Sequence, residues 1–555
     1  MPGAPIEPAP VEDDQAKDDV FHAEQVAGET AGYDEKAAAL SGRNVRNVYN
    51  ADLYEAVQNA HVPRWGKTTI QLYFAVFVTF CCSCANGYDG SLFTGILSMP
   101  YFQSTFQSGT TGSKVSVMSS MYSVGSLVGS PFAAFVSDRW GRRVGMFCGA
   151  WFITTGMIIT AASTTIPVFA VGRFVLGFGI HFMTIAAPSY TMEISPPHWR
   201  GRCTGLYNCG YYGGAIPAAA VTFGCNFLQS NWSWRVPLIL QAFACTIVIL
   251  FVFTIPESPR WLMANGREEE AIEYLIKYHA AGDRNSKLVQ LEVSEFRQHI
   301  AQNGADKRWW DYRPLVLTHN GRWRMAQVLM MSIAGQFSGN GLSYYNTVIY
   351  KQLGVTTVSM QLAYNLLYNV VAAVGAFSGA FLSDRMPRRK ILVSGTLICA
   401  GLLAINAGLQ LVIGKGMASH SVYAGALASY FLFGFVFMFS YTPLQAVVPT
   451  EALETTIRAK GLALAGVVSG CMGFINTFAG PIGLANIGYR YVWVFVGWDT
   501  FEGLMWYLFG VESQGKTLEE LNWIYDQPNP VKASLKTSEV VVTDDGTVVA
   551  RADEL

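Results

Sequence analysis

Stretches of more than 20 residues without a charged side chain recur along this chain. A helix that crosses a membrane needs about 20 mostly apolar residues. A soluble domain carries roughly 25% charged residues, whereas 14% of this chain is charged. Buried core helices of a large soluble protein are the alternative, but they are not expected to repeat uncharged runs of this length. The sequence therefore predicts a multi-pass membrane protein. The runs are 68–88, 115–137, 144–172, 236–256, 325–350 and 461–489.

Twelve membrane-spanning helices account for the apolar segments. The loops on one side of this arrangement carry most of the Lys and Arg residues, and loops of that kind face the cytosol. We therefore expect both chain ends to be cytosolic. The predicted helices are 70–97, 115–136, 145–163, 166–190, 203–226, 236–254, 325–349, 360–382, 391–412, 422–446, 461–482 and 491–510.

Three charged motifs occur twice, in the same order, just outside the apolar runs. The pairs are 138–143 with 384–389, 193–200 with 451–458, and 256–258 with 511–513. A duplication in register is typical of a transporter that is built from two similar bundles and binds its cargo between them. The predicted fold is an all-α membrane protein with twelve transmembrane helices in two six-helix bundles.

The same reasoning divides the chain into five parts. We expect the bundles at 69–256 and 325–510, with a disordered cytosolic tail at 1–68, a cytosolic linker at 257–324 and a cytosolic tail at 511–555. Within the linker, residues 268–278 place apolar and charged side chains on opposite faces of a helix. This pattern predicts an amphipathic helix that lies along the cytosolic side of the bundles.

The duplicated charges predict a conformational gate. Opposite charges at neighbouring helix ends form ion pairs that exist in one conformation and break in the other, which biases the two states of a transport cycle. A purely topological role for the arginines is the alternative, and it does not exclude the gate. The candidate gate residues are Asp138, Arg142, Arg143, Glu193, Arg200, Glu257, Arg260, Asp384, Arg388, Arg389, Glu451 and Arg458.

Two charges lie well inside predicted helices of the first bundle, Asp89 in the first and Arg173 in the fourth. A charge within a membrane costs roughly 2.5–3.5 kcal/mol on insertion scales, so each requires a partner or a function. A carboxylate beside a cation in a cavity can load and release a proton during transport. We interpret Asp89 and Arg173 as a proton-coupling pair. A static ion pair that only holds the two helices together is the alternative.

A second acidic pair lies in the last predicted helix, where Asp499 and Glu502 are three residues apart and share a face. A structural role is favoured for this pair, and its specific task is left open.

Neutral polar residues predict the path of the cargo. Carboxamides match adjacent sugar hydroxyls because they offer a donor and an acceptor side by side, and the spans hold no cluster of cations for an anionic cargo. Hydrogen bonding between helices is the alternative role. The candidate substrate residues share one face of the seventh helix and one face of the fifth; they are Gln336, Asn340 and Tyr344, and Asn208 and Tyr212.

Taken in order, the motifs resemble the sugar porter family of the major facilitator superfamily over residues 65–525. The motifs are Gly87-Tyr88-Asp89, 138–143, Gly172-Arg173, Glu193 with Arg200-Gly201, 256–261, 336–339 and 512–520. Residues 336–341 and 497–499 look like fungal lactose permeases and cellodextrin transporters. The resemblance implies a twelve-helix carrier for sugars, often coupled to protons, with Asp89 as the proton site beside Arg173, and Asn208 and Gln336 at sugar-binding positions.

Three departures from the family pattern concern the size of the cargo site. A paired glutamine of the family is Gly335 here, its following asparagine falls at Gly341, and a common tryptophan is Ala446. These smaller residues suggest a roomier site that suits a disaccharide. Pro387 also replaces the turn glycine of the first motif, which predicts a stiffer loop.

The sequence therefore favours a plasma-membrane sugar transporter that takes up a disaccharide of the lactose or cellobiose class together with protons. A monosaccharide carrier and a sugar sensor that moves no cargo are the alternatives. We expect no enzyme activity, cofactor or metal, because no nucleophile or ligand grouping appears. The expected partners are a sugar, protons and the lipid bilayer, with no nucleic acid, and the expected state is a monomer.

Overall fold

The computed structural model describes residues 66–196, 200–304, 313–382, 386–416, 419–453, 458–514, 516, 518–535, 540–542 and 548–551. The chain forms two compact units. One comprises Met1–Tyr54 with Lys536–Leu555, and its described part is an antiparallel hairpin of β1 (Val540–Val542) and β2 (Val548–Arg551). The other, Glu55–Leu535, holds every described helix. Most of the predicted tail 1–68 lies outside the described residues.

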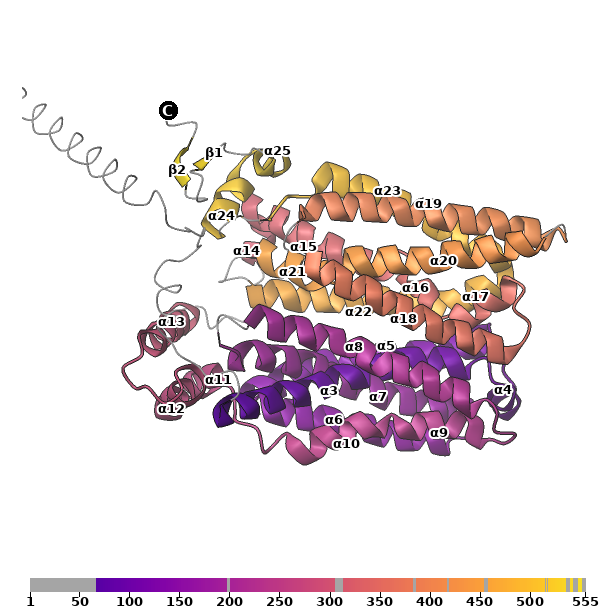
Figure 1. Cartoon of the computed structure of the whole chain (residues 1–555), viewed down its shortest axis with the longest axis horizontal. Coiled ribbons are helices and arrows are strands. Elements are labelled where there is room, and N and C mark those ends of the chain that lie inside the picture. The colour runs from indigo at the N-terminus through magenta and orange to yellow at the C-terminus, as the bar shows by residue number, and fades with distance from the viewer. Residues whose placement is uncertain are drawn as a thin grey trace, which may run out of the picture. The chain divides into compact units, whose positions relative to one another are not determined.

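The first bundle contains six spans within the larger unit (Figure 1). A short helix that was not predicted, α4, follows the first span, and Gln241 alone interrupts the sixth. The elements are α3 (Lys67–Ile96), α4 (Pro100–Phe106), α5 (Ser113–Trp140), α6 (Arg142–Ala162), α7 (Ile166–Ile194), α8 (Arg200–Cys225), α9 (Trp232–Leu240) and α10 (Ala242–Phe251).

The second bundle repeats this plan, with breaks in two of its spans (Figure 1). Its elements are α15 (His319–Phe337), α16 (Asn340–Ser343), α17 (Asn346–Gln352), α18 (Val358–Leu382), α19 (Arg388–Gly414), α20 (His420–Tyr441), α21 (Leu444–Ala452), α22 (Arg458–Ile487), the 3₁₀ turn η1 (Gly488–Arg490) and α23 (Tyr491–Phe509).

Apolar side chains cover the outer faces of both bundles. Phe243 is 71% exposed, Leu250 64% and Phe381 79%. Exposed apolar surface on this scale fits a lipid surround and not water. Eight helical segments among the described residues are long and apolar enough to cross a membrane. The prediction of an all-α membrane fold with two bundles is confirmed.

The prediction of one continuous seventh helix over 325–349 is wrong. The span starts earlier, at His319, and stops at Phe337 before resuming as α16 and α17. Gly339 has φ +82°, a conformation that a glycine adopts without steric cost and that ends the helix. The predicted tenth helix, 422–446, is also broken, because Pro443 separates α20 from α21.

The linker folds into four helices: α11 (Pro259–Ala264), α12 (Glu268–His279), α13 (Lys287–Gly304) and α14 (Arg313–Leu317). Residues 268–278 lie in α12, which has two distinct faces: it buries Leu275 completely and exposes Glu270 and Lys277. Its buried Tyr274 donates a hydrogen bond to the carbonyl oxygen of Ile194 at the end of α7 (3.0 Å). The linker therefore packs against the first bundle.

The C-terminal segment adds α24 (Leu518–Asp526) and α25 (Pro530–Ser534). Arg324 of α15 donates to the side-chain oxygen of Asn522 (2.6 Å) and to the carbonyl oxygen of Ala452 (2.7 Å). Its guanidinium lies over the ring of Tyr525, 4.7 Å from the centroid. One buried cation thus joins α15, α21 and α24.

Glycines bring α3 and α8 into backbone contact. A Cβ atom at Gly87 would lie 1.8 Å from the carbonyl oxygen of Tyr211, and one at Gly214 would lie 1.9 Å from that of Cys84. No side chain fits at either position. This close approach, typical of helices packed in a membrane, fixes Asp89 on α3 relative to the tyrosines of α8.

Candidate functional site

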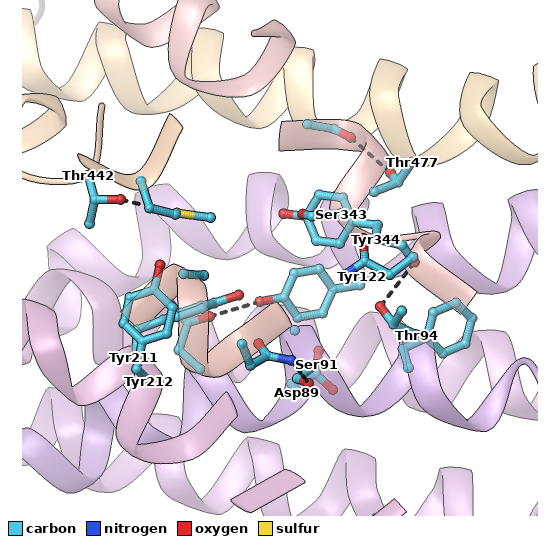
Figure 2. Close-up of a pocket in the computed structure, with 18 of the residues that line it drawn as sticks. Asp89, Ser91, Thr94, Tyr122, Tyr211, Tyr212, Ser343, Tyr344, Thr442 and Thr477 are labelled. Atoms are coloured by element: carbon cyan, nitrogen blue, oxygen red, sulfur yellow. Dashed lines mark hydrogen bonds between the residues drawn. The ribbon is translucent and has the colours of Figure 1, made fainter. Parts of the chain in front are cut away.

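A cavity of about 590 Å³ lies among helices of both bundles. Figure 2 shows Tyr122, Tyr211 and Tyr344 around it, with Asp89 close by. Such a volume is within the usual range for small-molecule sites. Its polar lining is chiefly carboxamides and tyrosines. The carboxamides are Asn86, Asn208, Gln336, Asn346, Asn365, Asn369 and Gln445, and the tyrosines are Tyr122, Tyr207, Tyr211, Tyr212, Tyr344, Tyr345 and Tyr368.

Hydrogen bonds between the two bundles close the cavity at the end that carries α4. Thr94 of α3 donates to the carbonyl oxygen of Tyr344, and Thr347 donates back to the carbonyl oxygen of Thr94, both at 3.0 Å. Ser119 of α5 donates to the carbonyl oxygen of Thr477 (3.0 Å). Asn226, just after α8, donates to the hydroxyl of Ser359 in α18 (3.1 Å).

Toward the opposite end, the cavity wall includes Pro188 of α7, Tyr207 of α8 and Gln445 of α21. These residues lie near the helix ends that bear the duplicated motifs, and Gln445 is exposed. The cavity is therefore sealed at the α4 end and reaches toward the motif end.

Asp89 and Arg173 form the predicted pair. Arg173 Nη1 donates to Asp89 Oδ1 at 2.7 Å, and the two residues are 5% and 1% exposed. Gln241 Nε2 donates to the same carboxylate oxygen at 3.2 Å. The carboxylate thus links α3 and α7 with the interruption between α9 and α10, and both charged residues belong to the cavity lining.

Aromatic rings hold the guanidinium of Arg173 from two directions. Its Cζ lies 4.7 Å from the ring centroid of Phe93 and 4.9 Å from that of Tyr122. Such contacts stabilise a cation that has lost its water. Sequence reasoning missed these rings and Gln241. Gln241 did carry a signal, because it is the one carboxamide in the apolar run 236–256.

Four of the five predicted substrate residues line the cavity: Asn208, Tyr212, Gln336 and Tyr344. The side chain of Asn340 lies outside the described part of the chain. The prediction of one helical face through Gln336, Asn340 and Tyr344 is wrong, since the helix breaks between Gln336 and Asn340. Gln336 reaches the cavity from the end of α15, where its Nε2 donates to the hydroxyl of Ser469 (3.2 Å).

Glu502 is tied to the breaks in both interrupted spans. Its Oε1 accepts hydrogen bonds from Ser338, which follows α15 (2.6 Å), and from Tyr441 at the end of α20; its Oε2 accepts one from Trp498 (3.0 Å). Asp499 is fully buried, and neither of its carboxyl oxygens has a partner among the described residues. This placement supports a structural role for Glu502.

The motifs of the first bundle meet at one point. Arg142 contacts both carboxylate oxygens of Glu193 at 3.3 Å and Asp138 Oδ1 at 2.7 Å. Ser258 also donates to Glu193. Glu257 Oε1 accepts from the backbone N–H of Arg142 (3.2 Å), and Arg143 Nε lies 3.9 Å from Glu257 Oε2.

The second bundle repeats this arrangement. Arg388 Nη1 lies 2.8 Å from Glu451 Oε2, and Ser513 donates to the same oxygen at 2.8 Å. The backbone N–H groups of Arg388 and Arg389 donate to Glu512 at 3.0 and 3.1 Å. Arg388, Glu451 and Glu512 thus make the contacts that Arg142, Glu193 and Glu257 make in the first bundle. These contacts lie within one bundle, so each cluster fastens the ends of its own helices.

Among the other candidate gate residues, the structure describes the side chain of Arg260. Arg260 lies over the ring of Phe296 in α13, 5.0 Å from its centroid, so it fastens the linker. Asp384 and the side chains of Arg200 and Arg458 lie outside the described residues.

Burial raises the pKa of Glu257 above its ordinary value, although backbone hydrogen bonds from Ser258 and Arg142 and the charge of Arg143 oppose that shift. The carboxylate of Glu257 can lie against the turn only because residue 141 is a glycine, with φ +102°. A Cβ at Gly141 would lie 2.6 Å from Glu257 Oε2.

Residues 75–525 match the model of the family described as "Sugar (and other) transporter". The chain belongs to this family of sugar porters. The family is one of transporters.

Known relatives align over most of their length. The MFS-type transporter criB of Aspergillus cristatus is 27% identical over 461 residues, covering 82% of this chain and 93% of that protein. The high-affinity glucose transporter of Kluyveromyces lactis is 26% identical over 483 residues, with 82% and 86% covered. Among solved structures, the proton:xylose symporter XylE of E. coli superimposes with a TM-score of 0.68 at 20% identity, covering 83% and 100%. At that identity the superposition establishes the fold alone.

Proposed function

We propose that this sugar porter carries a monosaccharide across the plasma membrane together with a proton. The observation that carries the proposal is the cavity itself, which joins a wall of carboxamides and tyrosines to a buried carboxylate–guanidinium pair. The sugar and the proton would then both bind at the cavity between the two bundles.

The relatives favour a monosaccharide over the disaccharide predicted from the sequence. One is named for glucose, and the structural neighbour is a xylose symporter bound to a glucose derivative. The cavity chemistry agrees with a neutral sugar, because its carboxamides can pair with adjacent hydroxyls and its tyrosine rings can cover apolar ring faces. The one cation among the described residues of the lining, Arg173, is already paired with Asp89.

Proton coupling would act through the Asp89–Arg173 contact. When Asp89 takes up a proton, it loses its charge and its attraction for Arg173 falls. The α3–α7 link then weakens, while Phe93 and Tyr122 keep the released guanidinium in place. Protonation thereby changes the balance between two conformations, which is the requirement for coupling it to transport.

The motif clusters would form the cytosolic gate, with both termini in the cytosol and a monomer as the working unit. With that orientation, the cavity sealed at the α4 end is an inward-facing state. The Arg142–Glu193 and Arg388–Glu451 pairs fasten each bundle separately here. Closing the cytosolic side requires these helix ends to approach each other, so the clusters are placed to set the energy of that step.

Competition for uptake tests the substrate class. The chain is expressed in cells that lack their own sugar transporters, and uptake of labelled glucose is measured against excess glucose, xylose, lactose or cellobiose. We expect the monosaccharides to compete and the disaccharides not to. Competition by lactose or cellobiose alone would restore the disaccharide reading. Binding to the purified protein without any uptake would identify a sensor instead.

A further inference from the structure

Gln445 occupies the space in which a side chain at position 335 would lie. A Cβ built on Gly335 would be 2.2 Å from Gln445 Nε2 and 3.0 Å from its Cδ. The same Nε2 donates a hydrogen bond to the carbonyl oxygen of Gly335 at 3.1 Å. The carboxamide of α21 is therefore seated on the bare backbone of α15, next to Gln336.

We propose that Gln445 is a specificity-determining residue that binds two adjacent hydroxyls of the sugar, and that Gly335 positions its carboxamide. The inference rests on the proposed function and deepens it, because it assigns part of sugar recognition to α21. Nothing in the duplicated motifs or in the polar faces of the fifth and seventh helices pointed to this residue.

The local backbone brings Gln445 to the cavity. Pro443 ends the continuous helix of α20, and α21 restarts at Leu444, so Gln445 lies in the first turn after the break. Thr442, which lies within the break, is also part of the cavity wall in Figure 2. Gln445 is exposed, and it belongs to the cavity lining.

The free groups of Gln445 have the chemistry that a pair of neighbouring hydroxyls requires. A carboxamide has two N–H donors and one acceptor oxygen. One N–H is used by Gly335, and no hydrogen bond of the described residues engages Oε1. The remaining N–H and the oxygen have a fixed relation to each other because the carboxamide is planar. The hydrogen bond to Gly335 restricts the rotation of the whole group. One hydroxyl can accept from the N–H while its neighbour donates to Oε1.

The first test uses Gln445→Ala in the uptake assay, with protein amount at the cell surface measured in parallel. Loss of a pair of neutral hydrogen bonds is expected to raise KM for the monosaccharide about threefold to tenfold while the maximal rate changes less than about twofold. Inhibition by a series of monodeoxyglucoses is measured alongside. In the wild type, removing either of two adjacent hydroxyls from glucose is expected to weaken inhibition. In Gln445→Ala, these two deoxyglucoses are expected to inhibit as well as glucose does.

The second test asks whether Gly335 acts through Gln445. Gly335→Ala places a methyl group on the Nε2 position, so it is expected to raise KM like Gln445→Ala. In the double variant, Gly335→Ala is expected to add no further increase, because no carboxamide remains to be displaced. Gly466→Ala in α22 is the matched control, since a Cβ there meets nothing within 4 Å.

The outcomes separate the inference from the function on which it rests. If the wild type takes up glucose but Gln445→Ala has an unchanged KM and deoxy-sugar profile, the inference is wrong and the transport function stands. If the KM increases of the two single variants multiply in the double variant, Gly335 does not act by positioning Gln445. If the wild type takes up and binds none of these sugars, the proposed function fails and the inference fails with it.

Discussion

Three side chains stabilise the buried guanidinium of Arg173. The carboxylate of Asp89 pairs with one nitrogen, and the rings of Phe93 and Tyr122 cover the planar guanidinium. A lysine would keep the charge but would lose the planar group that stacks on both rings.

Arg173→Lys tests whether the stacked plane matters. We expect transport to fall about tenfold at equal surface amount, because an ammonium group keeps part of the cation–π attraction and the loss of the stacked plane costs about 1–2 kcal/mol in total. The measurement is initial uptake of labelled glucose, with surface protein quantified by labelling. Wild-type rates in Arg173→Lys would show that the charge alone suffices.

At this scale the sequence predicted the partners that carry charge and missed those that do not. Asp89 and Arg173 stood out because charges within apolar runs are rare. Phe93 and Tyr122 are two among many aromatic residues, and only the packing of α3, α5 and α7 selects them. Gln445 was also invisible, because its position depends on the break before α21 and on a glycine in another helix.

Among the elements, the turn between α5 and α6 shows what the motif glycine does. Gly141 has a positive φ, and its missing side chain leaves room for Glu257. Gly112 has nearly the same φ, +104°, but a Cβ there meets nothing within 4 Å. The two positions therefore separate backbone strain from the loss of the Glu257 contact.

Gly141→Ala is expected to lower the free energy of unfolding more than Gly112→Ala does. Both variants should incur about 1–3 kcal/mol of backbone strain, and only the first displaces Glu257. Thermal unfolding midpoints of the purified proteins in detergent provide the comparison. Equal midpoints for the two variants would mean that the Glu257 contact adds nothing to stability.

Element boundaries show where periodicity fails as a guide. Ten predicted spans match one described helix or a helix pair with a single-residue interruption, because apolar length fixes a membrane helix. The seventh and tenth spans break at Gly339 and Pro443, and an apolar run does not reveal a break that side chains such as Glu502 stabilise. The predicted face through Gln336, Asn340 and Tyr344 failed for this reason.

For the whole molecule, the duplication had the greatest predictive value. Two bundles and two matched motif clusters follow from it, and the contacts of Arg142 with Glu193 and of Arg388 with Glu451 repeat as the sequence pairs do. The state in which the bundles meet could not be predicted, because one sequence encodes both states of the cycle. The hydrogen bonds between the two bundles at the α4 end define the conformation that the structure shows.

A reversible cross-link tests whether this end must open during transport. Asn226 and Ser359 lie on opposite bundles, and their side chains are hydrogen-bonded at 3.1 Å. In the double variant Asn226→Cys/Ser359→Cys, mild oxidation is expected to abolish uptake, and a reducing agent should restore it. Each single variant serves as a control for the native cysteines. Full activity of the oxidised, cross-linked protein would contradict alternating access at this end.

The most direct test of proton-coupled monosaccharide transport is the accumulation ratio of labelled glucose at several external pH values, for the wild type and Asp89→Asn. Asparagine keeps the size of the side chain but cannot bind and release a proton. The wild type is expected to concentrate the sugar inside the cell at acidic external pH, and Asp89→Asn is expected only to equilibrate it. Equal accumulation by both proteins, independent of pH, would contradict the coupling role of Asp89.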